Sequence, residues 1–391
     1  MIREQLDKTG SVVADTPDHA PILIGMMRVR GKPTSAARAA AHVALMQGAE
    51  LIYFNPDDVN FTTNSVSGWK YVRHMWVRVQ DRLPDVVIND LSSRSHRDVW
   101  RQLSARVPFT SPPIGDKSEI WRRMSKAGFY RELQIPTEIL TSFEHLLAFL
   151  NEHQKVVVKP QNGSQGKDVW FVGQDGKGFT VNDGVGWHEL SRGDLLAFYE
   201  QKLDRRYFLA QRYIASKTKS GLPFDIRIHV RRDYRAKWQI VNIYPRIGSG
   251  KGIVSNWHAG GSMGQLTGFL HQQYGEKAEG IHSLLEELGD HMPRRFQRLY
   301  DDRIIDALGI DLGLDESGQP WLFEVNDVPG TKLFSLEVAI YKVGYAILLA
   351  TKARRGEDVL RDKLPTLRTH NRYMNSAARV PTERNRLARQ L

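Results

Sequence analysis

The feature that most constrains the fold is a carboxylate-bearing hairpin toward the C-terminal end of the chain. Two apolar runs flank Ser317-Gly318, a dipeptide typical of a tight turn, within residues 309–330, GIDLGLDESGQPWLFEVNDVPG. Glu324 and Asn326 are two residues apart, so their side chains leave the same face of a strand. If Ser317-Gly318 is a two-residue loop, Asp311 lies directly opposite Glu324. The sequence therefore predicts two carboxylates that face each other across an antiparallel pair.

Facing carboxylates repel each other, and a divalent cation between them turns that repulsion into binding. Asp311, Glu324 and the amide oxygen of Asn326 are hard oxygen donors of the kind that magnesium takes, so these three residues are the predicted metal ligands. The alternative is a surface hairpin whose acidic residues only face water. A sheet buried on its other face is favoured by the apolar neighbours of the three donors, which are Leu312, Leu314, Trp321, Phe323 and Val325.

A second group of residues is suited to binding phosphate. Lys159 ends the apolar run VVVK, and the glycine-bearing segment 161–167, QNGSQGK, follows it. Glycines let backbone N–H groups approach phosphate oxygens closely, while serine adds a donor and lysine adds charge. The spacing is not that of a Walker A loop, and a strand over 169–172 is expected next rather than a helix. An ordinary hairpin turn is the alternative explanation.

A further lysine, Lys117, stands at the start of a predicted helix upstream of that segment. Asp116 is suited to cap this helix, and Glu119, three residues later, completes a capping box. The helix is expected to end near Gly128. The alternative for Lys117 is a solvated side chain without a function.

Two arginines lie on a predicted pair of strands. Residues 224–230, FDIRIHV, alternate so that the apolar side chains share one face and Asp225, Arg227 and His229 share the other. Residues 238–244 are expected to pair with this strand, and Arg246 follows them. An arginine can donate two parallel hydrogen bonds to phosphate or carboxylate oxygens. The alternative is an exposed face whose salt bridges contribute little to stability.

The glycine-rich segment 248–261, GSGKGIVSNWHAGG, carries Asn256 and His258. Such a segment is suited to shape itself around an anionic ligand. Three roles are open for His258, namely a general base, an orienting donor and a structural histidine.

Strands and helices alternate in the first part of the chain. Residues 21–90 read as an α/β lobe with a parallel sheet. The elements expected there are strands over 21–29, 51–55 and 85–89 and a helix over 34–47. Farther along, the patterns predict strands over 156–159 and 209–214 and helices over 280–305 and 333–353. The expected fold class is thus an α/β N-terminal lobe followed by an α+β body rich in antiparallel hairpins.

Composition and charge narrow the possible functions. The chain has no cysteine, which excludes disulfides, thiolate metal sites and a cysteine nucleophile. It has neither an apolar run of the ~20 residues that span a bilayer nor a signal peptide, so we expect a cytoplasmic location and no membrane partner. Residues 352–391 hold 11 Lys or Arg against 4 Asp or Glu, which gives this basic tail +7 of the net charge of +11. The tail is either a solvated segment or a contact for nucleic acid.

Five of these segments occur in an order that identifies a family by resemblance. They are KPQNGSQGK, FDIRIHV, PRIGSGKGIVSNWHAGG, GIDLGLD and FEVNDVPG. The set resembles the ATP-grasp enzymes, and it looks most like their YheC/YheD group, named for endospore coat association. It is also similar to the ligases that add glutamate to ribosomal protein S6 and to bacterial glutathione synthetases, which share the Asn-x-His-x-Gly-Gly element found here at 256–261. The resemblance covers residues 115–350.

The resemblance implies an architecture in which antiparallel sheets of two lobes sandwich ATP. It divides the chain into an N-terminal pre-ATP-grasp domain over 1–114, a small lobe with the phosphate loop over 115–215, a large lobe with the metal site over 216–351 and the basic tail over 352–391. The N-terminal domain resembles the domain that precedes the ATP-grasp body in such enzymes.

The resemblance also implies roles for residues. Those implied to bind ATP are Lys117, Lys159, Gly163, Ser164, Gly166 and Lys167 at the phosphates and the hinge Gln211, Arg212, Tyr213 and Ile214 at the adenine. Those implied to act on the reacting groups are Arg227, Arg246, Asn256 and His258. Asp311, Glu324 and Asn326 would hold magnesium. Two positions depart from the family pattern. Lys167-Asp168 stands where relatives often have arginine then glycine, and Asp327-Val328 stands where many have serine and lysine, which affects the expected acceptor site.

The activity that the resemblance implies is an ATP- and magnesium-dependent carboxylate–amine ligase. A substrate carboxylate, from an amino acid or a peptide, takes the γ-phosphate of ATP, and an amine then displaces phosphate from the acyl phosphate to leave an amide. Three alternatives stay open: an ATP-binding or spore-coat-associated structural protein without catalysis, a nucleic-acid-binding protein that uses the basic tail, and a phosphotransferase that stops at the phosphorylated product. Two explanations stay open for four residues of the N-terminal lobe, namely contacts to an acidic or peptide substrate and solvated loop charges. These residues are Arg28, Lys32, Arg94 and His96.

Overall fold

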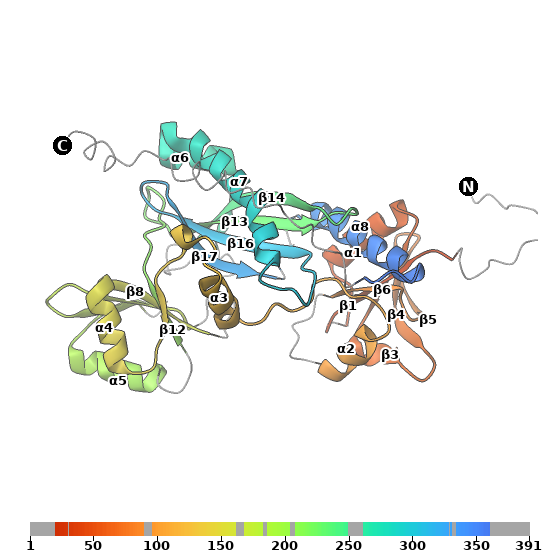
Figure 1. The fold of residues 1–391 in the computed structure, drawn as a ribbon, viewed down its shortest axis with the longest axis horizontal. Coiled ribbons are helices and arrows are strands. Elements are labelled where there is room, and N and C mark those ends of the chain that lie inside the picture. The colour runs from red at the N-terminus through yellow and green to blue at the C-terminus, as the bar shows by residue number, and fades with distance from the viewer. Residues whose placement is uncertain are drawn as a thin grey trace, which may run out of the picture.

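Over the residues that it describes, the computed structural model contains three β-sheets, each with its own helices (Figure 1). The residues that the structure describes are 20–29, 31–89, 96–161, 168–182, 186–203, 208–248, 261–327, 329–330 and 334–359. Among the helices within these ranges, none is long and apolar enough to cross a bilayer. Most of the predicted basic tail, from residue 360 onward, lies outside the described residues.

The N-terminal lobe is built on a sheet with parallel and antiparallel parts. Its parallel strands are β1 (Leu23–Met27), β2 (Glu50–Phe54) and β6 (Val86–Asn89), and its antiparallel strands are β3 (Val59–Asn60), β4 (Ser65–Val72) and β5 (Met75–Arg82). The helix α1 (Ser35–Met46) connects β1 to β2, and Thr34 caps it by accepting the N–H of Ala37 at 3.2 Å. The predicted parallel strands and helix are confirmed, whereas the β4–β5 hairpin and α2 (Arg97–Ser104) were not predicted.

The small lobe is an antiparallel sheet with two helices on one face. Along the sheet the order is β11-β10-β9-β8-β12-β7. Its strands are β7 (Thr137–Ile139), β8 (Lys155–Pro160), β9 (Trp170–Gln174), β10 (Phe179–Asn182), β11 (Trp187–Leu190) and β12 (Phe208–Arg212). The helices α4 (Phe143–His153) and α5 (Arg192–Lys202) cover the face turned away from the rest of the molecule (Figure 1). The other face of the sheet is not covered by these two helices and can therefore line a binding site.

The large lobe is a five-stranded antiparallel sheet with the order β15-β14-β13-β16-β17. Its strands are β13 (Phe224–Arg232), β14 (Trp238–Ile247), β15 (Ser262–Met263), β16 (Ala307–Leu314) and β17 (Pro320–Asn326). The helices α6 (Leu266–Tyr274) and α7 (Ala278–Gln297) pack on one face of this sheet. The predicted alternation of β13 is confirmed, because Phe224, Ile226, Ile228 and Val230 all join the core between the sheet and these helices.

The helix predicted over 280–305 was wrong at its C-terminal end, because α7 stops at Gln297. The Gln297 side chain is buried and donates to the carbonyl oxygens of Tyr300 and Arg303 at 3.0 and 2.8 Å. Its amide oxygen accepts the N–H of Ile305 at 2.8 Å. One buried amide thus organises residues 300–305 into a turn, which supplies the hydrogen bonds that a longer helix would have made.

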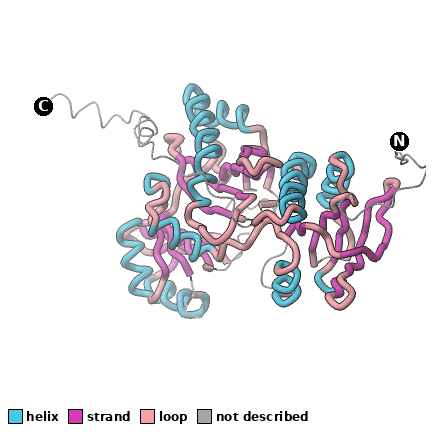
Figure 2. The backbone as a smooth tube through the Cα atoms, turned by 45° about the vertical axis from the view of Figure 1, so that its right-hand side comes forward, coloured by secondary structure: helices cyan, strands magenta, loops and turns pink. Residues whose placement is uncertain are grey.

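Two helices pack outside the lobe in which the sequence places them. The helix α8 (Ser335–Arg354) follows β17 in the chain, yet its buried residues Val343 and Ala346 join α1 in the core of the N-terminal lobe. The helix α8 contacts β6 of the N-terminal sheet and β13 of the large-lobe sheet, and α1 packs beside α8 on the N-terminal sheet (Figure 1 and Figure 2). The helix α3 (Lys117–Lys126) likewise contributes Ile120 and Met124 to the large-lobe core. These helices join the lobes into one body.

Candidate functional site

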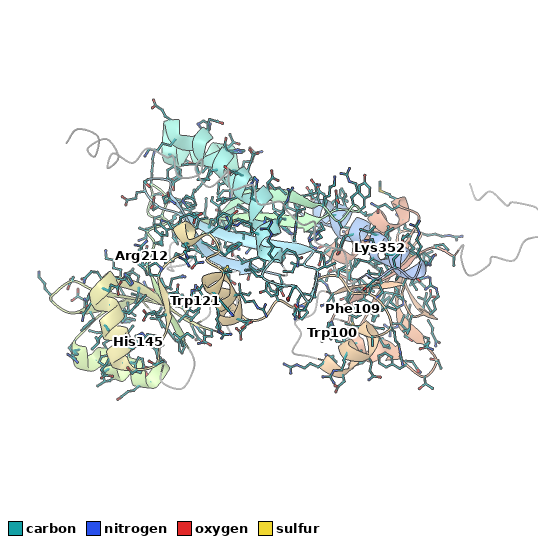
Figure 3. All side chains as sticks on the ribbon, in the orientation of Figure 1. Trp100, Phe109, Trp121, His145, Arg212 and Lys352 are labelled. Carbon is teal, nitrogen blue, oxygen red and sulfur yellow. The ribbon has the colours of Figure 1, made fainter. Side chains whose placement is uncertain are left out.

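A narrow cavity lies between α3 and the strands of the small and large lobes. Its open volume is about 50 Å³, which is room for a few water molecules. Its polar lining residues are Lys117, Gln134, Thr137, Lys159, Gln211 and Glu324, and its apolar ones are Ile120, Trp121, Met124, Ile135, Leu209, Leu322, Phe323 and Val325. Figure 3 labels Trp121 and Arg212, which lie where the small lobe meets the large lobe. The end at Lys117, Lys159 and Glu324 is thus charged, and most of the remaining lining is apolar.

The two predicted phosphate lysines meet at the charged end. Lys159 Nζ donates to Gln211 Oε1 at 2.9 Å, and Gln211 Nε2 donates to Thr137 Oγ1 at 3.0 Å. Lys117 Nζ lies 3.0 Å from Glu324 Oε2. Burial lowers the pKa of Lys159 to about 8, with Glu324 opposing the shift and Lys117 adding to it. A cation whose charge is this poorly compensated favours an anionic ligand.

Local structure explains why these lysines converge. The antiparallel pairing of β8 with β12 sets Lys159 opposite Leu209, so Gln211 follows on the same face two residues later. Asp116 caps α3 by accepting the N–H of Glu119 at 2.9 Å, which fixes Lys117 at the first helical position. The predicted capping box was wrong in its second half, because the Glu119 carboxylate pairs with Arg122 and Arg123 instead.

The predicted pairing of Asp311 with Glu324 across β16 and β17 is confirmed. The reason given for it, a two-residue loop, was wrong. Leu314 pairs with Pro320, so the loop holds five residues, and an irregularity after Asp311 restores the predicted register. Asp315 organises this loop, because its carboxylate accepts the backbone N–H groups of residues 317 and 319 and the Trp321 indole N–H.

Asp311 is held by two arginines of the neighbouring strands. Arg227 Nη2 and Arg246 Nη2 approach Asp311 Oδ2 at 2.8 and 2.9 Å, and Arg227 Nε donates to the other carboxylate oxygen. Asn326 Nδ2 donates to Asp311 Oδ2 at 3.3 Å, and Arg246 also donates to Asp225 Oδ1 at 2.6 Å. Burial opposes ionisation of Asp311, but the two guanidinium groups outweigh it and keep its pKa below the usual value.

Glycine at position 309 allows Arg227 to reach Asp311. Gly309 lies on β16 two residues before Asp311, and Arg227 crosses the strand there. A Cβ at Gly309 would lie 2.9 Å from Arg227 Nη1 and 2.9 Å from Pro329 Cβ. Both neighbours are buried, so a larger residue would displace the guanidinium group.

The predicted site residues are only partly brought together. The cavity is lined by four of them, Lys117, Lys159, Gln211 and Glu324. Asp311 pairs with Glu324 across the strands, and its carboxylate contacts the side chains of Arg227, Arg246 and Asn326. Of the four hinge residues only Gln211 lines the cavity. The Arg212 guanidinium lies 4.5 Å from the Trp321 ring centroid, and the Tyr213 ring packs against Phe171 at 5.0 Å. Residues predicted on the loops that lie outside the described residues are Gly163, Ser164, Gly166, Lys167, Asn256 and His258.

Several lining residues were not singled out from the sequence as site residues. Trp121 and Met124 lie four and seven residues after Lys117 on α3, a spacing that puts them on one helical face. Leu322 precedes Glu324 by two residues on β17. Their signal was the same periodicity that predicts a core, so the sequence alone did not separate them from ordinary core residues.

The donor set at the predicted metal site fits magnesium in its chemistry, with two carboxylates and one amide. Within the described residues there is no group of three or more His, Cys, Asp or Glu side chains that could hold a metal. A cation would therefore have to share Asp311 with two arginines and Glu324 with Lys117.

The substrate-reading residues expected in the N-terminal lobe are partly described. His96 Nε2 lies 3.6 Å from Asp57 Oδ1, and Arg94 lies outside the described residues. His96 has a left-handed backbone, with φ of 61°, and it immediately precedes α2.

With this geometry established, comparisons with known proteins identify the family. The family described as YheC/D like ATP-grasp matches residues 106–346, which is more than half of the chain. The chain belongs to this ATP-grasp family. The predicted ATP-grasp architecture, with an α/β lobe ahead of a two-lobed body, is thereby confirmed.

Two curated relatives come from Bacillus subtilis (strain 168). The endospore coat-associated protein YheD is 23% identical over 304 residues, which cover 74% of this chain and 66% of YheD. The endospore coat-associated protein YheC is 20% identical over 303 residues, which cover 73% of this chain and 82% of YheC. The chain thus spans just under two thirds of the length of YheD.

The solved structures to which this chain is similar have low sequence identity to it. The RimK domain protein ATP-grasp from Sphaerobacter thermophilus is 13% identical with a TM-score of 0.47, over 84% of this chain and 98% of that one. D-alanyl-alanine synthetase A from Vibrio cholerae is 12% identical with a TM-score of 0.47, over 86% and 99%. The ATP-grasp ligase PsnB, complexed with minimal precursor, Mg and ADP, is 12% identical with a TM-score of 0.48, over 84% and 98%.

Proposed function

We propose that this protein is an ATP- and magnesium-dependent carboxylate–amine ligase that forms an amide or peptide bond through an acyl phosphate. The observation that carries the proposal is the convergence of Lys117 and Lys159 with Glu324 at one end of a cavity whose remaining lining is mostly apolar. Two lysines beside a carboxylate suit a triphosphate with its cation, and the apolar lining suits a nucleoside ring. Membership of the ATP-grasp family supports the same ligand.

In the proposed reaction the protein mainly positions the reactants and neutralises their negative charge. A carboxylate oxygen of the substrate attacks the γ-phosphorus of ATP, the bond to the β-phosphate oxygen breaks, and ADP leaves. An amine then attacks the acyl carbon, and phosphate departs as the amine loses a proton. Lys117 and Lys159 bind phosphate oxygens, while Arg227 and Arg246 neutralise charge at the transferred group or hold the substrate carboxylate. Magnesium, held by Asp311, Glu324 and Asn326, would supply further positive charge to the phosphoryl oxygens.

The family resemblance adds the residues outside the described ranges to this proposal. Segment 162–167 would cover the phosphates, and Asn256 and His258 would face the reacting groups. A nucleotide needs more room than this narrow cavity offers, so we propose that the lobes move apart when it enters. Closure afterwards would exclude the water that otherwise hydrolyses the acyl phosphate.

The test is an assay of ADP release over pools of amino acids, peptides and amines, with hydroxylamine added to trap an acyl phosphate. We expect magnesium-dependent ADP release that requires a carboxylate substrate, and we expect Glu324→Gln to abolish it with the fold intact. Glu316→Gln is the matched control, because Glu316 is exposed in the loop of the same hairpin. Unchanged turnover in Glu324→Gln would contradict the proposed site.

A second candidate function is nucleotide binding without turnover. It is favoured by the names of YheD and YheC, which describe those relatives as endospore coat-associated rather than as ligases. Saturable binding of ATP with no ADP release over the whole substrate pool would select this candidate.

A further inference from the structure

The carboxylates of the predicted metal site are already engaged by the protein's own cations. Asp311 Oδ2 accepts from Arg227 at 2.8 Å, from Arg246 at 2.9 Å and from Asn326 at 3.3 Å, and Oδ1 accepts from Arg227. Glu324 pairs with Lys117 at 3.0 Å. A carboxylate offers about four lone-pair positions, and four donors engage Asp311, three of them at Oδ2 and one at Oδ1. Asn326 also presents its amide N–H to Asp311 rather than an oxygen that a metal could use.

The charge around these carboxylates is positive overall. Within the described contacts of the cluster, four cations face three carboxylates. The cations are Lys117, Lys159, Arg227 and Arg246, and the carboxylates are Asp225, Asp311 and Glu324. A divalent cation entering alone would meet this excess of positive charge. It would also have to displace a buried guanidinium group from Asp311, which is costly unless that group finds another partner.

A polyphosphate removes both obstacles. A nucleoside triphosphate brings several negative charges and offers the lysines and arginines new oxygen acceptors of the geometry that guanidinium groups prefer. Once these cations turn to phosphate, Asp311 and Glu324 are free to ligate a metal. The amide of Asn326 can then turn its oxygen toward the metal.

We propose that the metal site opens only with nucleotide: Arg227, Arg246 and Lys117 occupy Asp311 and Glu324 until a polyphosphate draws these cations away, so that a divalent cation binds strongly only together with the nucleotide. This inference rests on the proposed function, because it takes the same residues as metal and phosphate ligands. By linkage, the nucleotide strengthens metal binding by the same factor as the metal strengthens nucleotide binding. A coupling of roughly 5- to 150-fold is the usual range between two such sites.

The test measures Mn²⁺ binding by the full-length protein from the electron paramagnetic resonance signal of free Mn²⁺. Titrations are run with the protein alone and with the protein plus a non-hydrolysable ATP analogue, and Mn²⁺ held by the analogue without protein is subtracted. Binding of the analogue in EDTA is measured separately by calorimetry. We expect the analogue to bind in EDTA, and we expect saturable Mn²⁺ binding only when the analogue is present.

The two possible failures are distinguishable. If the analogue does not bind with or without Mn²⁺, the proposed function fails and the inference fails with it. If the analogue binds, but Mn²⁺ binds the protein equally well without it, the proposed function stands and this inference is overturned.

Two variants test the role of the cations that occupy Asp311 and Glu324. Arg246→Gln removes one guanidinium group from Asp311, and Lys117→Gln frees Glu324 at the half-buried start of α3. Each is expected to strengthen Mn²⁺ binding to the nucleotide-free protein by about tenfold, within the range that couples two charged ligands. Lys126→Gln, at the exposed far end of α3, is the charge-matched control and should change nothing.

The variants are first checked for folding by circular dichroism. If Arg246→Gln does not fold, Lys117→Gln still tests the inference, because Lys117 lies outside the buried arginine cluster. Unchanged Mn²⁺ affinity in the folded variants would overturn the inference.

Discussion

At the scale of single residues, the burial of Lys159 lowers its pKa and reduces the stability of the fold at neutral pH. Its folded-state pKa of about 8 lies below the unfolded value of 10.5, so the unfolded chain holds more protons between these values. Stability therefore rises with pH from about 8 to 10.5, and the charged lysine destabilises the fold below pH 8.

The first prediction follows from this rise of stability with pH. Lys159→Met should stabilise the nucleotide-free protein at pH 7 by about 1–3 kcal/mol, since a shift of one pKa unit corresponds to ~1.4 kcal/mol. The gain should shrink as the pH approaches 10, and nucleotide affinity should fall at every pH. Thermal unfolding at pH 7, 8 and 9.5 measures the gain, with Lys155→Met, an exposed lysine of the same strand, as the control. A variant that is less stable than the parent at pH 7 would refute the explanation.

The second prediction concerns Gly309. Gly309→Ala should push Arg227 away from Asp311, lower stability by about 1–3 kcal/mol and reduce ADP release, because the added Cβ meets Arg227 and Pro329 at 2.9 Å. Gly280→Ala is the matched control, because nothing lies within 4 Å of its Cβ position in α7, and it should stabilise by about 0.5–1 kcal/mol. Chemical denaturation of both variants measures the difference. Equal effects of the two substitutions would count against the steric argument.

At the scale of elements, alternation and turn residues were enough to predict the hairpin of β16 and β17, whereas the correct pairing of Asp311 with Glu324 was predicted from a two-residue loop that the hairpin does not have. These signals were not enough to predict the five-residue loop, because Asp315 folds it through contacts that include a residue six positions away, Trp321. The β4–β5 hairpin escaped prediction for a similar reason. Its turn uses Arg73 and His74, with φ of 47° and 67°, in place of the Asn-Gly pair that usually signals such a turn.

The third prediction tests that loop. Asp315→Ala removes the acceptor of two backbone N–H groups and of the Trp321 indole, and it should lower stability by about 1–3 kcal/mol. Because the loop sets the register of Glu324, nucleotide affinity in magnesium should fall as well. Thermal unfolding and calorimetry measure the two effects. Glu316→Ala, the exposed neighbour, should leave both unchanged.

Within the site, the sequence predicted the charged residues better than their partners. Lys117, Lys159 and Glu324 stood out because their residue types suit phosphate and metal. The engagement of Asp311 by Arg227 and Arg246 could not be predicted, since it depends on β13 lying between β14 and β16 in the sheet. The side chains of Arg212 and Tyr213 likewise point to aromatic partners from distant segments, Trp321 and Phe171.

At the scale of the whole molecule, buried contacts join the N-terminal lobe to the large lobe. Asp306 accepts the backbone N–H and the hydroxyl group of Ser111, and it lies 3.9 Å from Arg231 on β13. Asn89 at the end of β6 donates to the Ser111 carbonyl oxygen at 3.1 Å. The sequence predicted a helix over 333–353, but a helical pattern does not say against which lobe the helix packs.

The fourth prediction tests this junction. Asp306→Asn should lower the free energy of unfolding by about 1–3 kcal/mol, because it replaces a buried carboxylate that accepts from Ser111 and lies 3.9 Å from Arg231 with a neutral amide. Urea unfolding measures the loss, and hydrogen exchange should show it first around residues 107–112 and 303–312. Asp301→Asn, an exposed carboxylate nearby, is the control. A loss below about 1 kcal/mol would mean that the junction is not held by this pair.

The central claim is that Lys117, Lys159 and the carboxylates of one hairpin surround a single triphosphate. Calorimetric titration of the protein with a non-hydrolysable ATP analogue in magnesium tests it most directly. We expect one saturable site per chain, weakened about 100-fold by Lys159→Met, since a charged contact to phosphate contributes about 1.5–3 kcal/mol. The absence of saturable binding, or equal affinity in Lys159→Met, would contradict the claim.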